Sequence, residues 1–96
     1  MQERIVTITN RLGLHARAAA RLVRRAGQFT SDVELVRRDT GETADGKSIL
    51  SVLLLAASTG TCLIVKTTGE DEVHAANELV DLIESKFGEE VSDGVF

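Results

Sequence analysis

The chain has 96 residues, 43% of them hydrophobic and 27% charged, which is the composition of a soluble globular domain with one core. Its single cysteine, Cys62, excludes an internal disulfide and a cysteine-based zinc cluster, and it indicates a reducing, cytoplasmic setting. The longest apolar run, Val52 to Ala57, is too short to span a bilayer, and the first residues lack the pattern of a signal peptide. We expect no membrane insertion, no metal site and no cofactor.

The net charge of −4 is divided unevenly along the chain. Residues 1–48 carry nine basic and six acidic side chains, whereas residues 49–96 carry two basic and nine acidic ones. The basic half suits an acidic protein partner or a phosphate group. Nucleic-acid binding is disfavoured, because the chain is acidic overall and has no Tyr or Trp to stack on bases.

Alternation of apolar and polar residues predicts two strands before residue 46, and a turn signal after the second predicts a third. The predicted strands cover residues 4–9, 32–38 and 42–44. Their inward faces carry branched apolar side chains: Val6, Ile8, Val33 and Leu35. The turn signal Asp39-Thr40-Gly41 makes the second and third strands a hairpin.

Between the first two strands, the spacing predicts a helix over residues 17–26. Its apolar stripe consists of Ala19, Leu22, Val23 and Ala26. Arginines line another face of the same helix: Arg17, Arg21, Arg24 and Arg25. Gly27 is the expected C-cap.

A second helix is predicted over residues 47–57, with Ser48 near its N-cap. The residues expected to face the core are Ile49, Val52, Leu53 and Ala56. This assignment leaves Leu50 and Leu54 exposed together. A fully buried strand is the alternative, because short apolar runs do not distinguish the two.

The remaining elements are a strand over residues 61–68 and a helix that begins near Glu70. The apolar residues of this helix recur at spacings of three and four: Val73, Ala76, Val80, Ile83 and Phe87. Gly88 ends it, and residues 89–96 are expected to form a flexible tail. We expect Cys62 to be a small buried hydrophobe and His74 to lie on the surface.

The element order is thus β-α-β-β-α-β-α in a single domain, residues 1–88. A mixed order with helices that can cover only one face predicts an α+β sandwich, in which a mostly antiparallel sheet lies under a helical layer.

The most informative stretch is Gly13-Leu14-His15-Ala16-Arg17, where a turn leads into the first helix. The first N–H groups of a helix have no partner inside it and carry a partial positive charge, so they can bind a phosphate. A histidine at this point can become a phosphohistidine, held by the N–H groups of Ala16 and Arg17 and by the Arg17 guanidinium. The alternative is that His15 only caps the helix.

Together with Gly46-Lys47-Ser48-Ile49-Leu50, this motif makes the chain resemble the HPr family over roughly residues 4–87. HPr proteins are the histidine-phosphorylated carriers of the bacterial phosphoenolpyruvate-dependent phosphotransferase system. The resemblance implies an open-faced β-sandwich, in which a four-stranded antiparallel sheet is covered on one face by three helices. It also implies a stoichiometric carrier rather than an enzyme.

The resemblance further implies a role for particular residues. His15 would accept a phosphoryl group on Nδ1 from enzyme I and pass it to an enzyme IIA-type domain, with Arg17 contacting the group. Ser48 would be the target of an HPr serine kinase/phosphorylase in some bacteria. The residues expected to dock partners are Arg21, Arg24, Lys47, Leu50, Leu53 and Leu54. We expect an exposed His15, no enclosed substrate cavity and a monomer, because partners must reach the histidine.

The chain departs from the family pattern at Ala18, where a proline usually follows the arginine. Alanine leaves the first turn freer and adds one backbone donor. It also resembles the regulatory or nitrogen-related branch of the family. Two other functions remain open: a module that binds a free anion at the helix start, and a regulatory interaction protein that is phosphorylated without supporting sugar transport.

Overall fold

The computed structural model describes residues 1–89, in which four strands and three α-helices follow one another along the chain. The strands are β1 (Gln2–Thr7), β2 (Asp32–Arg37), β3 (Thr43–Asp45) and β4 (Cys62–Thr68). The helices are α1 (Ala16–Ala26), α2 (Ile49–Leu54) and α3 (Glu72–Glu84), followed by a 3-10 turn, η1 (Lys86–Gly88). The predicted element order is confirmed. None of these helices is long and apolar enough to cross a membrane.

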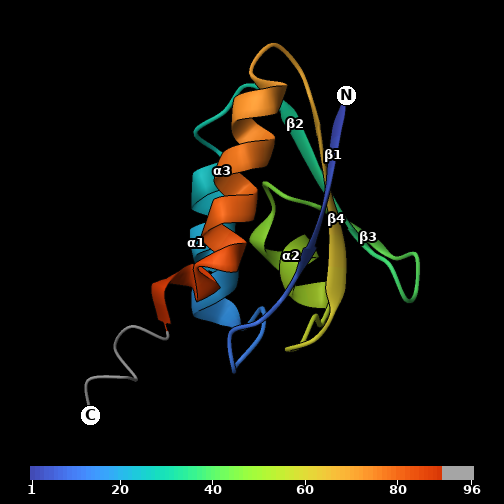
Figure 1. Ribbon diagram of the computed structural model, residues 1–96, viewed down its shortest axis with the longest axis vertical. Helices are drawn as coiled ribbons and strands as arrows, with labels where there is room; N and C mark the ends of the chain where they lie inside the picture. The colour runs from blue at the N-terminus through green and yellow to red at the C-terminus, as the bar shows by residue number, and fades with distance from the viewer. Residues whose placement is uncertain (90–96) are drawn as a thin grey trace.

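The four strands form one sheet in the order β1-β4-β2-β3, and every neighbouring pair is antiparallel. In Figure 1, α1 and α3 lie beside each other on one side of this sheet, and α2 follows the short strand β3. This is the predicted open-faced α+β sandwich. The first strand begins two residues earlier than predicted, since its ladder with β4 runs from Gln2 to Thr7.

The core lies between the inner face of the sheet and the helices. The strands contribute Val6, Val33, Leu35, Leu63 and Val65, all buried. The predicted stripe of α1 is confirmed, because Ala19, Leu22 and Ala26 are fully buried and Val23 packs against the core. Gly27 is the C-cap of α1, as predicted, although its backbone stays right-handed.

The second predicted helix is shorter than its apolar run. α2 ends at Leu54, whereas the sequence predicted helix as far as Ala57. Val52 is buried and Leu53 packs against the core as predicted, but the core positions given to Ile49 and Ala56 are wrong. Ile49 lies on the first, exposed turn. After α2 the chain turns through a left-handed Ala56 (φ 52°), so its neighbours Leu55 and Ala57 become buried instead.

The third helix packs through a slightly different face from the one predicted. Ala76 and Ile83 are buried and Val80 packs against the core, but Val73 is 50% exposed and Leu79 takes a core position. Phe87 is buried as predicted, although it belongs to η1 and not to α3. The helical spacing ends at Glu84 because the backbone turns left-handed two residues later.

The open face of the sheet decides the position of Cys62. Alternation along β4 buries Leu63 and Val65 and leaves Cys62 and Ile64 half-buried on the uncovered face. The expectation of a buried cysteine was therefore wrong. His74 is exposed as predicted, and its ring packs edge-on against Phe29 at 5.2 Å between centroids.

Candidate phosphoryl-acceptor site

His15 occupies the N-cap position of α1 through its backbone. Its φ of −74° and ψ of 179° are extended, and its carbonyl accepts the first helical hydrogen bond, from the Ala19 N–H at 2.8 Å. The His15 side chain makes no capping hydrogen bond. The imidazole is therefore not the group that satisfies the helix start.

A tight loop delivers His15 to this position. The Gly13 N–H donates to the Asn10 carbonyl at 3.1 Å, and Asn10 Nδ2 donates back to the Gly13 carbonyl at 2.8 Å. The Leu14 N–H donates to the Ala57 carbonyl at 2.8 Å, which fixes the loop against the chain that follows α2. Gly13 has a φ of +67°, and a Cβ there would lie 2.7 Å from the Ala57 carbonyl oxygen. Only glycine fits this close approach without distortion.

Three backbone N–H groups precede the first hydrogen bond of α1, those of Ala16, Arg17 and Ala18. Ala16 and Arg17 are exposed, so this helix end is accessible, whereas the Ala18 side chain is fully buried. A helix start with free donors attracts an anion, and the Arg17 side chain extends from the same turn. The structure thus brings together the three predicted groups: His15, Ala16 and Arg17.

The His15 ring is half-buried, with 29% of the side chain exposed. Its Nε2 lies 2.5 Å from Glu89 Oε2, and Glu89 Oε1 accepts a hydrogen bond from Asn10 Nδ2 at 2.9 Å. A carboxylate therefore covers one nitrogen of the ring. The expectation of an exposed histidine holds for only part of the imidazole.

The sequence did not indicate Asn10 or Glu89 as site residues. One signal for Asn10 was available: it continues the inward alternation of Val6 and Ile8, so a polar residue stands where a core residue belongs. No comparable sequence pattern marked Glu89, because it stands in an acidic stretch of the kind that usually lies on the solvated surface. Apart from Glu89, the predicted tail lies outside the described residues.

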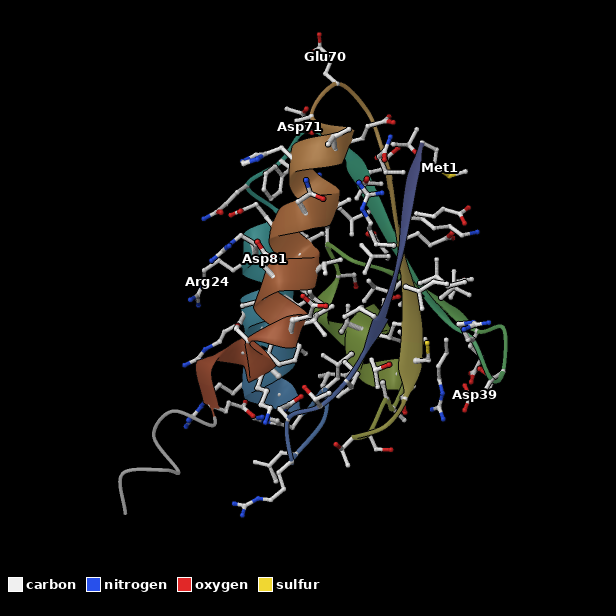
Figure 2. All side chains as sticks on the ribbon, viewed as in Figure 1. Met1, Arg24, Asp39, Glu70, Asp71 and Asp81 are labelled. Atoms are coloured by element: carbon white, nitrogen blue, oxygen red, sulfur yellow. The ribbon has the colours of Figure 1, made fainter. Side chains whose placement is uncertain are left out.

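The arginine face of α1 is only partly free. Arg24 is exposed and points away from the sheet (Figure 2). Arg21 donates to the Phe87 carbonyl, and Arg25 pairs with Glu78 at 3.1 Å. Arg21 thus holds η1 against α1 as well as contributing positive charge.

The predicted leucine patch lies on α2. Leu50 is 65% and Leu54 70% exposed, whereas Leu53 is half-buried against the core. Ile49 (44%) and Leu12 (64%), which were not predicted for this patch, are also exposed. The bond between Leu14 and Ala57 places the C-terminal end of α2 beside the loop of His15.

Ser48 lies at the other end of α2. It is the N-cap as predicted, and its Oγ accepts a hydrogen bond from the Ser51 N–H at 3.3 Å. The Lys47 ammonium donates to the Phe29 carbonyl at 2.8 Å, just beyond the C-terminus of α1, so it already has a structural partner. The six residues of α2 span about 9 Å, which separates Ser48 from the His15 end.

A carboxylate with a strongly lowered pKa, that of Asp71, lies where α3 begins (Figure 2). Asp71 accepts hydrogen bonds from the Ser31 hydroxyl and from the N–H groups of Thr30 and Ser31. These bonds, led by that of the Ser31 hydroxyl, lower the pKa of Asp71 to about 2. They fasten the loop between α1 and β2 to α3. In residues 1–89, no three His, Cys, Asp or Glu side chains are grouped to hold a metal ion.

Comparison with known proteins decides the family. The family model described as "PTS HPr component phosphorylation site" matches residues 2–85. The chain belongs to the HPr family. It is 50% identical over 84 residues to the phosphocarrier protein HPr of Pseudomonas aeruginosa. The alignment covers 88% of this chain and 92% of that protein.

Other HPr proteins are similar over almost the whole chain. Identity to phosphocarrier protein HPr of Cupriavidus necator is 46% over 89 residues, covering 93% of this chain and 98% of that protein. A crystal structure of HPr from Thermoanaerobacter tengcongensis aligns with a TM-score of 0.88 at 40% identity, covering 93% of this chain and 98% of that one. The chain is thus a phosphocarrier of the phosphotransferase system, not a turnover catalyst, and the predicted family and fold are confirmed.

Proposed function

We propose that His15 is the phosphoryl acceptor of this HPr protein. It receives the group from phosphorylated enzyme I and passes it to an enzyme IIA-type domain. The observation that carries the proposal is the position of the imidazole: it stands at the open start of α1 without capping it. A histidine side chain is substantially neutral near pH 7, so it can act as a nucleophile there.

The surroundings supply what phosphoryl transfer requires, namely positioning and charge neutralisation. The N–H groups of Ala16 and Arg17 lie in the first turn of α1 and make no helical hydrogen bond, and the Arg17 guanidinium adds a full positive charge. The N–H of Ala18, which a proline would lack, is a third donor at the same end. An accessible site of this kind lets a partner's histidine approach in line.

Partners dock over two neighbouring surfaces in this proposal. The exposed Leu50 and Leu54 supply an apolar surface beside the histidine loop, and Ile49 extends it. Arg24 and the charge of Arg21 supply a basic surface for an acidic partner. The protein acts in the cytoplasm as a monomer, because a carrier must keep both surfaces free.

We also propose that Ser48 is a regulatory phosphorylation site for an HPr serine kinase/phosphorylase. A phosphate at the N-cap of α2 is compatible with the helix, since negative charge is favourable there. The length of α2 separates it from His15. A phosphate on Ser48 therefore weakens the docking of partners, because it places about two negative charges beside Leu50.

Intact mass measured after incubation with phosphoenolpyruvate and enzyme I tests the role of His15. Wild type and the control His74→Gln should each gain one acid-labile, base-stable phosphoryl group, and His15→Ala should gain none. The HPr protein of Pseudomonas aeruginosa shows that the enzyme I preparation is active. Uptake by His15→Ala, or no uptake by wild type beside an active reference, refutes the proposal. A group that enters and is never passed to any IIA domain supports the regulatory alternative.

A further inference from the structure

The contact between Glu89 and His15 is built into the fold. Only 14% of the Glu89 side chain is exposed, and a carboxylate hidden to this extent is costly without donors. His15 Nε2 at 2.5 Å and Asn10 Nδ2 at 2.9 Å each face a different oxygen of this carboxylate. A solvated surface glutamate has no need of such an arrangement.

Asn10 fixes the position of that carboxylate. Its side chain is fully buried, and its amide donates to both the Gly13 carbonyl and Glu89. Within residues 1–89, its Oδ1 has no hydrogen-bond partner. An unpaired buried oxygen is unfavourable, so the amide is oriented for its two donor contacts at some loss of stability. One buried side chain thus ties the loop before His15 to Glu89.

The backbone that delivers Glu89 is also strained. Lys86, Phe87 and Gly88 have φ values of 59°, 55° and 75°, and a left-handed conformation is unfavourable for the first two. The turn is held because Phe87 is only 1% exposed and its carbonyl accepts a hydrogen bond from Arg21. Strain of this kind, next to a proposed reactive group, is a feature of functional sites.

We propose that Glu89 is a positioning residue for phosphoryl transfer at His15. Its carboxylate accepts the Nε2–H hydrogen bond and so keeps the proton on Nε2, which leaves the lone pair on Nδ1. A carboxylate that holds one nitrogen of a histidine fixes both the tautomer and the ring orientation. This inference rests on the proposed function, because it concerns how the same histidine is presented.

The transfer step then needs no proton movement. The Nδ1 lone pair attacks phosphorus, the bond from phosphorus to the partner's histidine nitrogen breaks, and that nitrogen keeps the bonding pair. The His15 ring now carries a phosphoryl group on Nδ1 and a proton on Nε2, so it is cationic. The Glu89 carboxylate offsets that positive charge. In onward transfer the N–P bond breaks, and the neutral Nε2–H ring is restored.

The test compares Glu89→Ala with Glu84→Ala, which removes an exposed carboxylate at the end of α3. Glu89→Gln is a milder second variant: Asn10 and His15 both donate to the carboxylate, and an amide has only one oxygen to offer them. Two quantities are measured, the initial rate of phosphorylation by enzyme I and the ring-nitrogen NMR shifts of His15. The spectra are taken near pH 9, about two and a half units above the ordinary histidine pKa of about 6.5. Subtracting the His15→Ala spectrum removes the signals of His74, the only other histidine.

Wild type and Glu84→Ala should show one tautomer, with the proton on Nε2, and the same rate. Glu89→Ala should show a mixture of tautomers and a rate lower by roughly tenfold or more, the usual effect of losing such an orienting partner. An unchanged tautomer overturns the proposal even if the rate falls, since Glu89 would then only anchor the chain. A mixed tautomer with a wild-type rate also overturns it. Phosphate uptake by wild type is read in the same experiment, so a failure of the proposed function is seen separately.

Discussion

Substitution of Gly13 tests whether the loop before His15 is as tightly packed as the structure indicates. Gly13 has a φ of +67°, and a Cβ built there would lie 2.7 Å from the Ala57 carbonyl oxygen and 2.8 Å from the Ser58 Cα. Gly41 is a matched control: its φ is +78°, and nothing lies within 4 Å of its Cβ position. Alanine at either position meets the same backbone penalty, but only at position 13 does it meet other atoms.

The magnitudes follow from this difference. A left-handed alanine costs about 1–2 kcal/mol, and the reduced freedom of the unfolded chain offsets about 0.4–1 kcal/mol of that. Gly41→Ala should therefore lower the free energy of unfolding by about 1 kcal/mol. At Gly13 the clash is with backbone atoms that cannot rotate away, which adds about 1–3 kcal/mol. Gly13→Ala should lose about 2–4 kcal/mol in total, a large share of the roughly 5–15 kcal/mol of a typical domain.

Urea unfolding followed by far-ultraviolet circular dichroism measures both variants, because the chain has no Trp or Tyr for fluorescence. The rate of His15 phosphorylation should fall in Gly13→Ala and stay unchanged in Gly41→Ala. Equal losses of stability in the two variants would refute the close approach of the Gly13 loop to Ala57. A destabilised Gly13→Ala with a wild-type rate would show that the loop does not position His15.

Three further outcomes are expected. Ser48→Asp should keep its stability, because aspartate also caps helices, but should be phosphorylated by enzyme I more slowly than wild type; equal rates would remove the proposed effect on docking. Ala18→Pro should raise the free energy of unfolding by about 0.5–1 kcal/mol, because proline reduces the freedom of the unfolded chain and the N–H that it lacks makes no helical hydrogen bond here. A decrease in urea titrations would mean that the core has no room for the proline ring. Asp71 has a lowered pKa of about 2 against an ordinary value of 3.8, so its stabilising contribution is present above about pH 4 and is lost as the pH falls towards 2. The stability difference between wild type and Asp71→Asn should shrink over that interval, and a constant difference would contradict the assignment.

Much of the fold could be predicted from the sequence because its signals are local. The alternation around Val6 and Leu35 and the turn at residues 39–41 fix the strands, and helical spacing fixes α1. The glycine, histidine and arginine of residues 13–17 mark the helix start as an anion site by residue type alone. These features depend on neighbours within a few positions.

The errors occur where tertiary packing overrides a local pattern. An apolar run does not reveal that the chain leaves α2 at Leu54, so Ile49 and Ala56 were assigned to the core. The sequence did not indicate Glu89 as a site residue for a related reason. Its partners lie more than seventy positions away, and it reaches them only through two left-handed residues that no propensity favours.

The contact between positions 15 and 89 has a consequence for the order in which the protein is made. A ribosome releases His15 early and Glu89 only after every strand and α-helix described here has been synthesised. A nascent chain that ends before this glutamate therefore carries its histidine without the carboxylate. Proteolytic trimming after Gly88 would return a finished molecule to the same condition while leaving in place the four strands and three α-helices described here. The histidine site is thus completed only after all of these elements exist, by a residue 74 positions further along the chain.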